Sequence, residues 1–278
     1  MNIHTLVFVT SAACLASGCQ YRPTTPSPSR DKPHHPGIEY LAAQDVDWTA
    51  LNPARGDQSP QAADLWGDRA VDGATGFMVK FVDGFSSPPH IHNVTYRGVV
   101  LDGLVHNDDP AAPPMWMPAG SFWTQPAGDN HITAAKGPRN IAYIEIDAGP
   151  YLVQPSDEAF ATAERPINVD ASNLVWVEQP SGVHLAYLWG DPQNDQPAGL
   201  FLRLSPEFSG SIRTPNTPLR MVVVKGNVEL TTDEGIVSLA PGSYFGTTSA
   251  GTLHLASDAT VPAQLYLRAA GRFTVVRD

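Results

Sequence analysis

The sequence predicts an all-β protein built from two similar units in tandem. Gly and Pro are frequent, with 23 and 26 residues among 278, while only 16% of the residues are charged. This balance suits short strands joined by many turns. The tetrapeptide Leu-Trp-Gly-Asp occurs at residues 65–68 and again at 188–191, an offset of 123 residues (188 − 65). A repeat of this length indicates two copies of one folding unit.

The repeat holds its register along both copies. The same offset of 123 pairs Gly76 with Gly199 and Arg97 with Arg220. Further pairs at this offset are Phe85 and Phe208, Gly103 and Gly226, and His131 and His254. We therefore expect one barrel over residues 38–155 and a second over 156–278.

The first 18 residues are predicted to be a signal peptide. The apolar run at 6–16 is too short to span a bilayer. It leads into Leu-Ala-Ser-Gly-Cys, which resembles the cleavage site of bacterial lipoproteins. That resemblance implies lipidation of Cys19 and a protein anchored at the cell envelope, on the outer membrane facing the periplasm. The alternative is an ordinary secretory signal in which Cys19 has no role.

Residues 19–37 are rich in Pro, Ser and Thr and are predicted to be a flexible tether. The sequence contains two cysteines, Cys14 and Cys19, and both precede the expected barrels. The barrels can therefore hold neither a disulfide nor a cysteine-based zinc site.

Period-two alternation of apolar and polar residues predicts the strands of each unit. The clearest examples are 76–84 and 199–207, and then 140–149 and 262–271. The stretches 96–108 and 219–232 each carry β-branched residues on both sides of a glycine, which predicts a hairpin. Residues 157–165, between the units, favour a short helix or a turn.

Two glycine-bounded motifs in the first unit place three histidines near one another. His90 and His92 lie two residues apart in a predicted strand, so their side chains point to the same face. His131 follows a Pro-Ala-Gly turn. Three imidazoles that converge from two segments could hold a divalent metal and leave it an open coordination position. The alternative is a buried cluster of neutral histidines without metal.

These motifs resemble those of the cupin family. The first motif matches at Gly84, His90, His92 and Gly103, and the second matches at Gly120, Pro126, Gly128 and His131. The flanking residues resemble an uncharacterised bicupin family, a domain of unknown function similar to the zinc-binding cupin of ChrR-type anti-sigma factors. This resemblance, over roughly residues 38–278, implies two jelly-roll barrels and a metal pocket in the first.

The chain departs from the cupin pattern at one ligand position, where Tyr96 replaces the usual Glu. Tyr96 could bind the metal, donate a hydrogen bond to a bound ligand, or form an aromatic wall. Gln125 could bind the metal or hold an anionic substrate, or it could be a plain turn residue. Tyr96 and Gln125 are our two candidate catalytic residues. Glu145 could supply the missing carboxylate or lie exposed on the opposite face.

Three further residues are expected to serve the fold. Arg97 should point away from Tyr96 and form a structural salt bridge, since its counterpart Arg220 persists in the second unit. His106 and Asn107 are expected in a loop after the first hairpin, although they could lie at the mouth of the pocket.

The second unit is predicted to lack the metal site. Adding 123 to His90, His92 and Tyr96 gives Arg213, Pro215 and Leu219, and neither Arg nor Pro can replace an imidazole as a ligand. His254 remains, and alone it is expected to be a hydrogen-bonded interior residue.

Charge and motifs narrow the function without fixing it. The net charge of −11 argues against a nucleic-acid partner. A metal-dependent enzyme of the oxidoreductase type, acting on a small organic molecule, is favoured over a zinc-dependent binding or sensing module. Neutral nitrogen ligands accept zinc, iron or manganese. A monomer and a homodimer are both compatible with the sequence.

Overall fold

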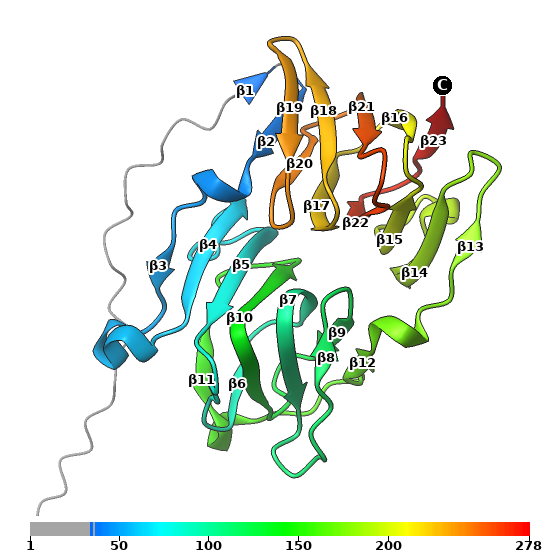
Figure 1. Ribbon diagram of the computed structural model, residues 1–278. Helices are drawn as coiled ribbons and strands as arrows, with labels where there is room; N and C mark the ends of the chain where they lie inside the picture. Colours follow the sequence, from blue (N-terminus) through cyan, green and yellow to red (C-terminus); the bar gives the residue numbers. More distant parts are fainter. Residues whose placement is uncertain (1–33, 36) are drawn as a thin grey trace, which may run out of the picture.

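Alternating apolar and polar residues form strands through most of the chain. The computed structural model describes residues 34–35 and 37–278 (Figure 1). The predicted signal peptide and Cys19 lie outside the described residues. Among the residues that are described, no helix is long and apolar enough to cross a membrane.

The lower barrel in Figure 1 is formed mainly by the first half of the chain. Its strands are β3 (Thr49–Ala50), β4 (Gln61–Trp66), β5 (Thr75–Phe81), β6 (His90–His92), β7 (Tyr96–Asp108), β8 (Met117–Pro118), β9 (Phe122–Gln125), β10 (Ile132–Ile146), β11 (Val153–Pro155) and β12 (Ile167–Val169). The larger sheet has the order β12-β9-β7-β10-β5-β4-β3, with β8 paired to β7, and β11 pairs with β6.

The second half forms the upper barrel. Its strands are β13 (Val177–Glu178), β14 (His184–Gly190), β15 (Ala198–Leu204), β16 (Ser209–Thr214), β17 (Leu219–Lys225), β18 (Val228–Thr232), β19 (Gly235–Leu239), β20 (Tyr244–Thr247), β21 (Gly251–Ser257), β22 (Ala263–Ala269) and β23 (Thr274–Arg277). They form the sheets β20-β17-β22-β15-β14-β13 and β19-β18-β21-β16-β23. The prediction of an all-β protein with two jelly-roll barrels is confirmed.

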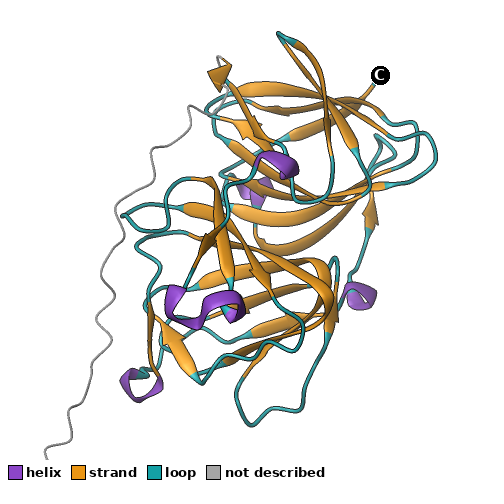
Figure 2. Ribbon diagram, turned by 60° about the vertical axis from the view of Figure 1, so that its left-hand side comes forward, coloured by secondary structure: helices purple, strands orange, loops and turns teal. Residues whose placement is uncertain are grey.

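The described helices are single 3-10 turns or short runs of them (Figure 2). They are η1 (Ala43–Asp45), η2 (Pro53–Gln58), η3 (Ser156–Glu158), η4 (Ala171–Asn173) and η5 (Pro192–Asn194).

Short strands are exchanged across the boundary expected at residue 155. Near the N-terminus, β1 (His34–His35) pairs with β2 (Ile38–Leu41), and β2 pairs with β20 of the second barrel. In return, β12 pairs with β9 of the first barrel. Each half therefore completes a sheet of the other.

The second barrel has an apolar interior, and the two barrels meet at an apolar interface. The second is filled by apolar side chains such as Leu202, Phe208 and Leu253, which are 0–1% exposed. Another apolar cluster contains residues of both halves, among them Phe201, Val222, Phe122 and Val99. Figure 2 shows the barrels stacked, with strands of both along the contact. The interface is therefore a hydrophobic core in its own right.

A polar network with repeat symmetry lies inside this interface. Trp66 donates to the hydroxyl of Tyr143 (3.1 Å), and their counterparts Trp189 and Tyr266 do the same (3.0 Å). Both tyrosines donate to the carboxylate of Glu145, at 3.2 and 2.7 Å. The repeat thus places matching Trp–Tyr pairs on either side of one buried carboxylate.

The position equivalent to Glu145 in the second copy is Arg268, and these two residues form an ion pair (3.2 Å). Arg268 also contacts Asp147 (2.6 Å). Arg97 contacts Asp147 (3.0 Å) and stacks over the Trp189 ring (3.7 Å), so its predicted structural role is confirmed.

The two predicted hairpins are wrong. Gly103 and Gly226 have φ angles of +73° and +68°, but the segments on either side do not pair with each other. β7 continues through Gly103, with β10 as its partner on both sides of the bend. At Gly226 the chain passes from the sheet of β17 to the sheet of β18. The glycines bend a strand from one sheet towards the other, since this backbone conformation favours Gly.

Of the two alternatives for residues 157–165, a short helix or a turn, the structure has a single 3-10 turn, η3, at the start of the segment and no longer helix. All nine of these residues are exposed, so a helix here would bury no apolar face. Short helices in water need such packing. The segment instead lies extended against the first barrel, where Phe160 donates to the Gly128 carbonyl (3.2 Å).

Candidate metal centre

The three predicted histidines come together inside the first barrel. β6 carries His90 and His92, and the backbones of His90 and His131 donate to each other's carbonyls at 3.0 Å. This isolated bridge places His131 beside the strand that carries the other two. One potential ligand atom from each ring lies within 4.8 Å of the others, and His92 and His131 are buried.

Backbone carbonyls hold one nitrogen of each ring. Nδ1 of His90 contacts the carbonyl of Pro88 (2.9 Å), Nδ1 of His92 that of Leu152 (2.9 Å), and Nδ1 of His131 that of Asp129 (3.0 Å). A carbonyl oxygen only accepts, so Nδ1 must carry the hydrogen in each ring. The lone pair of a neutral ring then lies on Nε2, which is the usual arrangement behind metal-binding histidines.

The site favours the neutral form of all three rings. Burial, aided by His90, lowers the pKa of His131 to about 3. Burial and then the neighbouring His131 and His90 hold the pKa of His92 well below its ordinary value of 6.5. Burial also lowers the pKa of His90. Neutral imidazole is the form that binds metals.

The donor set fits a divalent metal ion. Nitrogens bound at ~2.1 Å to a shared ion lie about 3–4 Å apart, so small movements of the rings would suffice from the separations seen here. The three Nε2 atoms are the ones that would hold it. In the described part of the chain, this is the one group of three or more His, Cys, Asp or Glu side chains close enough to bind an ion together.

Tyr96 lies at the edge of this cluster. Its hydroxyl is 2.8 Å from Oδ1 of Asn107 and 3.3 Å from Nε2 of His131. Asn107 also accepts from Thr133 (2.7 Å) and donates to Oε1 of Gln125 (2.9 Å). The Tyr96 hydroxyl donates its hydrogen to Asn107 and also lies next to His131. A direct role of Tyr96 in catalysis stays a prediction.

Gln125 supports His131 from behind. Its amide nitrogen donates to the carbonyl of Asp129 (3.1 Å), which also accepts from Nδ1 of His131. Both ends of the Gln125 amide are therefore occupied, and its direct role in catalysis stays a prediction. Asn107, at the centre of these contacts, lies in β7 and is 2% exposed. The expectation of a loop for His106 and Asn107 is wrong, because β7 does not end at Gly103.

Glu145 does not supply the missing carboxylate. It lies on the outer face of β10, in the interface between the barrels, and is 0% exposed. The prediction that it faces away from the barrel interior is confirmed, but the expected exposure is wrong. The second barrel covers that face of β10, and the alternation of apolar and polar residues along one strand cannot predict such coverage.

The second barrel holds no equivalent cluster in its described residues. Arg213 and Pro215 are exposed, and Leu219 is part of the apolar core. His254 is exposed on β21, so the prediction of an interior histidine is wrong. An interior filled by apolar side chains leaves no partner for an imidazole there.

Sequence reasoning missed Tyr151, which follows the first barrel's last long strand. Its ring stacks on His92, with centroids 4.3 Å apart and an interplanar angle of 18°. Its hydroxyl is 3.0 Å from Nε2 of His92. The residue lies outside both histidine motifs, and no local pattern indicates that the chain returns to β6 at this point.

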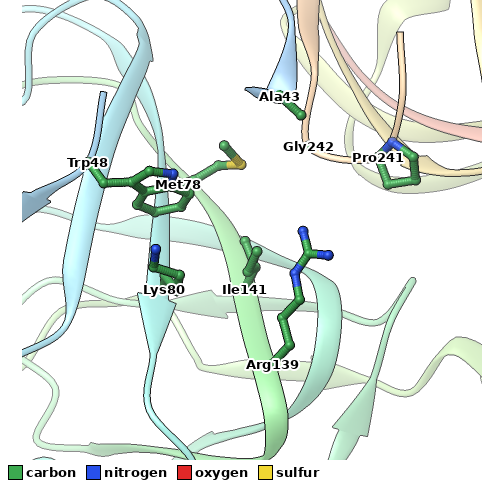
Figure 3. A pocket seen from close by; sticks show the side chains of 8 residues that line it. All are labelled: Ala43, Trp48, Met78, Lys80, Arg139, Ile141, Pro241 and Gly242. Carbon is green, nitrogen blue, oxygen red and sulfur yellow. The ribbon is translucent and has the colours of Figure 1, made fainter. Parts of the chain in front are cut away.

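Two cavities are lined by residues other than the three histidines. Figure 3 shows the first, about 160 Å³ in volume, between the barrels. It is lined by Ala43, Trp48, Met78, Lys80, Arg139, Ile141, Pro241 and Gly242. The second, of about 190 Å³, is lined by Gln125, Pro166, Asn130 and three aspartates, Asp108, Asp109 and Asp129.

The family model described as a domain of unknown function, DUF4437, matches residues 39–276, which include both barrels and the three histidines. The chain belongs to the DUF4437 family. The family assignment names no reaction. No curated protein matches this DUF4437 chain.

Solved structures similar to this DUF4437 protein are cupin-fold proteins. A "putative dioxygenase" from Nostoc punctiforme has a TM-score of 0.66 and 15% identity, covering 84% of this chain and 83% of that one. Protein Ylba from E. coli has a TM-score of 0.61 and 12% identity, with 86% and 93% covered. A mutant oxalate decarboxylase from Bacillus subtilis has a TM-score of 0.56 and 11% identity, with 88% and 80% covered. At these identities the likeness shows the fold alone.

Proposed function

We propose that this protein is a metal-dependent enzyme acting on a small organic substrate, with dioxygenase-like or other cupin chemistry. The observation that carries the proposal is the convergence of three neutral imidazoles whose Nδ1 atoms are all held by backbone carbonyls. Such a set orients three Nε2 lone pairs towards one point. A metal held there would supply Lewis-acid or redox chemistry with coordination positions open to substrate.

The chain's own residues would position the reacting groups. Asn107, Gln125 and the Asp129 carbonyl fix the ring of His131, while the Leu152 carbonyl fixes His92. Burial raises the pKa of Tyr96 and of Tyr151 above the ordinary value of 10, so both phenols stay protonated and act as hydrogen-bond donors. The Nostoc "putative dioxygenase" supports an oxidoreductase as the reaction class.

A second function, zinc-dependent binding or sensing of a small ligand, is favoured by one observation. Among the described residues, the side chains that contact the three rings are tyrosines, serine and the other histidines, and none is a carboxylate. A site without a general base near neutral pH suits ligand capture without turnover.

We also propose that the protein is an exported lipoprotein, anchored through Cys19 at the outer membrane and facing the periplasm. The small residues that precede Cys19 and the Pro-rich stretch after it support this proposal. Labelling cells with an alkyne fatty acid tests it: wild type should carry the label and Cys19→Ala should not. Label that persists in the variant would contradict lipidation at Cys19.

Metal analysis of protein purified without a histidine tag tests the metal centre. Wild type should contain close to one equivalent of divalent metal, and His131→Ala should lose most of it. His254→Ala is the matched control, because it removes the exposed histidine at the equivalent repeat position and should keep the metal. Less than about half an equivalent in wild type would contradict the proposal.

Metal identity and turnover then separate the two functions. Iron or manganese together with substrate-dependent oxygen uptake would support the enzyme. Tightly held zinc, with no turnover of a broad panel of small organic acids and ketones, would support the binding or sensing module.

A further inference from the structure

Consecutive residues of the segment after β10 hold both nitrogens of one metal-ligand candidate. The Leu152 carbonyl accepts from Nδ1 of His92, and the Tyr151 hydroxyl contacts Nε2 of the same ring at 3.0 Å. This segment is fixed at several points. Asn93 bonds to Pro150 and Leu152, and β11 pairs with β6 opposite His92.

The hydroxyl of Tyr151 has one hydrogen-bond partner in the described structure, and that partner is Nε2 of His92. A metal bound at the three histidines would take the lone pair of this nitrogen. The phenol of Tyr151 would then lose its acceptor while it stays packed against Phe77 and Tyr96, at 5.1 and 5.8 Å between centroids. A buried donor without an acceptor is unfavourable, so a ligand atom that accepts from Tyr151 would be stabilised.

The charge of the site points to the same kind of ligand. Among the described residues, the polar side chains that contact the three rings are uncharged hydroxyls and the other histidines, and Tyr96 stands where cupins carry a Glu. Three neutral imidazoles and a divalent ion would carry a net charge of +2 in a largely buried place. A buried charge needs a counter-charge. An anionic ligand would supply this negative counter-charge, which the side chains around the three rings do not supply.

We propose that the metal site takes a small anionic oxygen ligand, of the carboxylate or enolate class, and that Tyr151 positions it by donating a hydrogen bond to its oxygen. This inference rests on the proposed metal centre and specifies its substrate class. Tyr96 is less suited to this role, because its hydrogen is already directed to Asn107 at 2.8 Å.

The test uses the full-length protein loaded with cobalt(II), whose visible absorption responds to added ligands. Acetate and its neutral isostere acetamide are the probes. We expect wild type to bind acetate at least about ten times more tightly than acetamide. Tyr151→Phe should weaken acetate binding about tenfold or more, the effect of losing one hydrogen bond to a charged acceptor, and should leave acetamide less affected.

Tyr187→Phe is the control, because Tyr187 is 43% exposed on the second barrel; it should behave as wild type. A purely structural role for Tyr151 would instead lower cobalt affinity and thermal stability without changing the ratio of acetate to acetamide affinity. Equal binding of the two probes by wild type, or an unchanged ratio in Tyr151→Phe, would overturn the inference. If Tyr151→Phe does not fold, 3-fluorotyrosine at position 151, a stronger donor, should tighten acetate binding several-fold, and no change would overturn the inference.

Failure of the metal centre itself gives a different result. Wild type would then bind no stoichiometric cobalt, and the spectra would show no histidine-bound ion before any probe is added.

Discussion

The imidazoles of the first barrel are held neutral by their surroundings, and this gives the metal-free protein a defined response to pH. Each ring keeps its hydrogen on Nδ1, facing a backbone carbonyl, while burial disfavours a second proton on Nε2. In the unfolded chain the same rings have ordinary pKa values near 6.5. The folded state therefore binds fewer protons than the unfolded state between these values.

We expect the free energy of unfolding to fall as the pH drops below about 6.5, in the presence of a chelator. The folded pKa of His131 is about 3, so this one group should cost up to about 1.4 kcal/mol per pH unit in that window. Above pH 6.5 the His131 ring is neutral in both the folded and the unfolded state, so no stability is lost there. Urea unfolding at pH 7, 6 and 5 measures the loss. His131→Asn should show a shallower slope and His254→Ala an unchanged one; equal slopes in wild type and His131→Asn would contradict this account.

Asn107 joins the side chains behind the metal site. Its amide accepts from Tyr96 and Thr133 and donates to Gln125, all within 2.9 Å. Asn107→Leu should leave these buried groups without partners and lower the unfolding free energy by roughly 2–4 kcal/mol. Asn216→Leu, at an exposed turn, should change it by less than about 0.5 kcal/mol. Urea titration compares them, and similar small losses in both would show that the network contributes little.

At the scale of strands and turns, the linking segment 156–169 has no α-helix, and it covers the second histidine motif. Gly128 has φ +76°, and a Cβ there would lie 2.4 Å from the carbonyl oxygen of Phe160. Gly84, in the first motif, has a similar φ of +71° but nothing within 4 Å of a Cβ. An alanine at Gly84 would therefore meet only the strain of the backbone angle, whereas an alanine at Gly128 would also be crowded by Phe160.

Gly84→Ala should lower the unfolding free energy by about 1 kcal/mol, the cost of a left-handed angle for a residue with a Cβ. Gly128→Ala should lower it by at least about 1 kcal/mol more and should also weaken metal binding, because Gly128 donates to the His92 carbonyl at 2.9 Å. Thermal unfolding and metal titration measure both effects. Equal losses in the two variants would mean that Phe160 does not pack on Gly128.

Local patterns predicted several of the longer strands but not their partners. Alternation located β5, β10, β15 and β22, in which one face packs in a barrel interior and the other in the cluster between the barrels. It could not show that Gly103 bends one continuous strand, since a glycine with positive φ serves a tight turn equally well. The segment 157–165 has residues that favour helix, and the absence of a surface to pack on decides against it.

At the scale of the whole molecule, the repeat builds an interface that is symmetric in shape and asymmetric in charge. Glu145 and Arg268 occupy equivalent positions in the two copies and form an ion pair, and Arg97 and Arg220 place cations over Trp189 and Trp66. Two identical copies would bring two carboxylates together here. Because the second copy has Arg268 where the first has Glu145, contact between the two halves of one chain is favoured.

Arg268→Met should lower the unfolding free energy by about 3–5 kcal/mol, because it leaves the buried carboxylate of Glu145 without its closest cation. Arg139→Met is the control: its ion pair with Asp102 is exposed, at 67% and 45%, and should contribute about 0–1 kcal/mol. Urea unfolding gives both values. Equal effects would show that the pair at the interface is no more important than one at the surface.

The sequence contained the repeat and the three histidines, since both are marked by residue spacing. It could not reveal the strand exchange, the burial of Glu145 or the position of Tyr151 over His92. Those depend on how one half of the chain packs on the other, and on where a segment without a motif of its own returns to β6.

X-ray absorption at the edge of the bound metal tests the central claim most directly. On wild-type protein purified without a tag, we predict a first shell with three imidazole nitrogens at about 2.0–2.2 Å and a loss of imidazole scattering in His131→Asn but not in His254→Ala. A protein that binds no metal, or a spectrum that is the same in all three proteins, would contradict it.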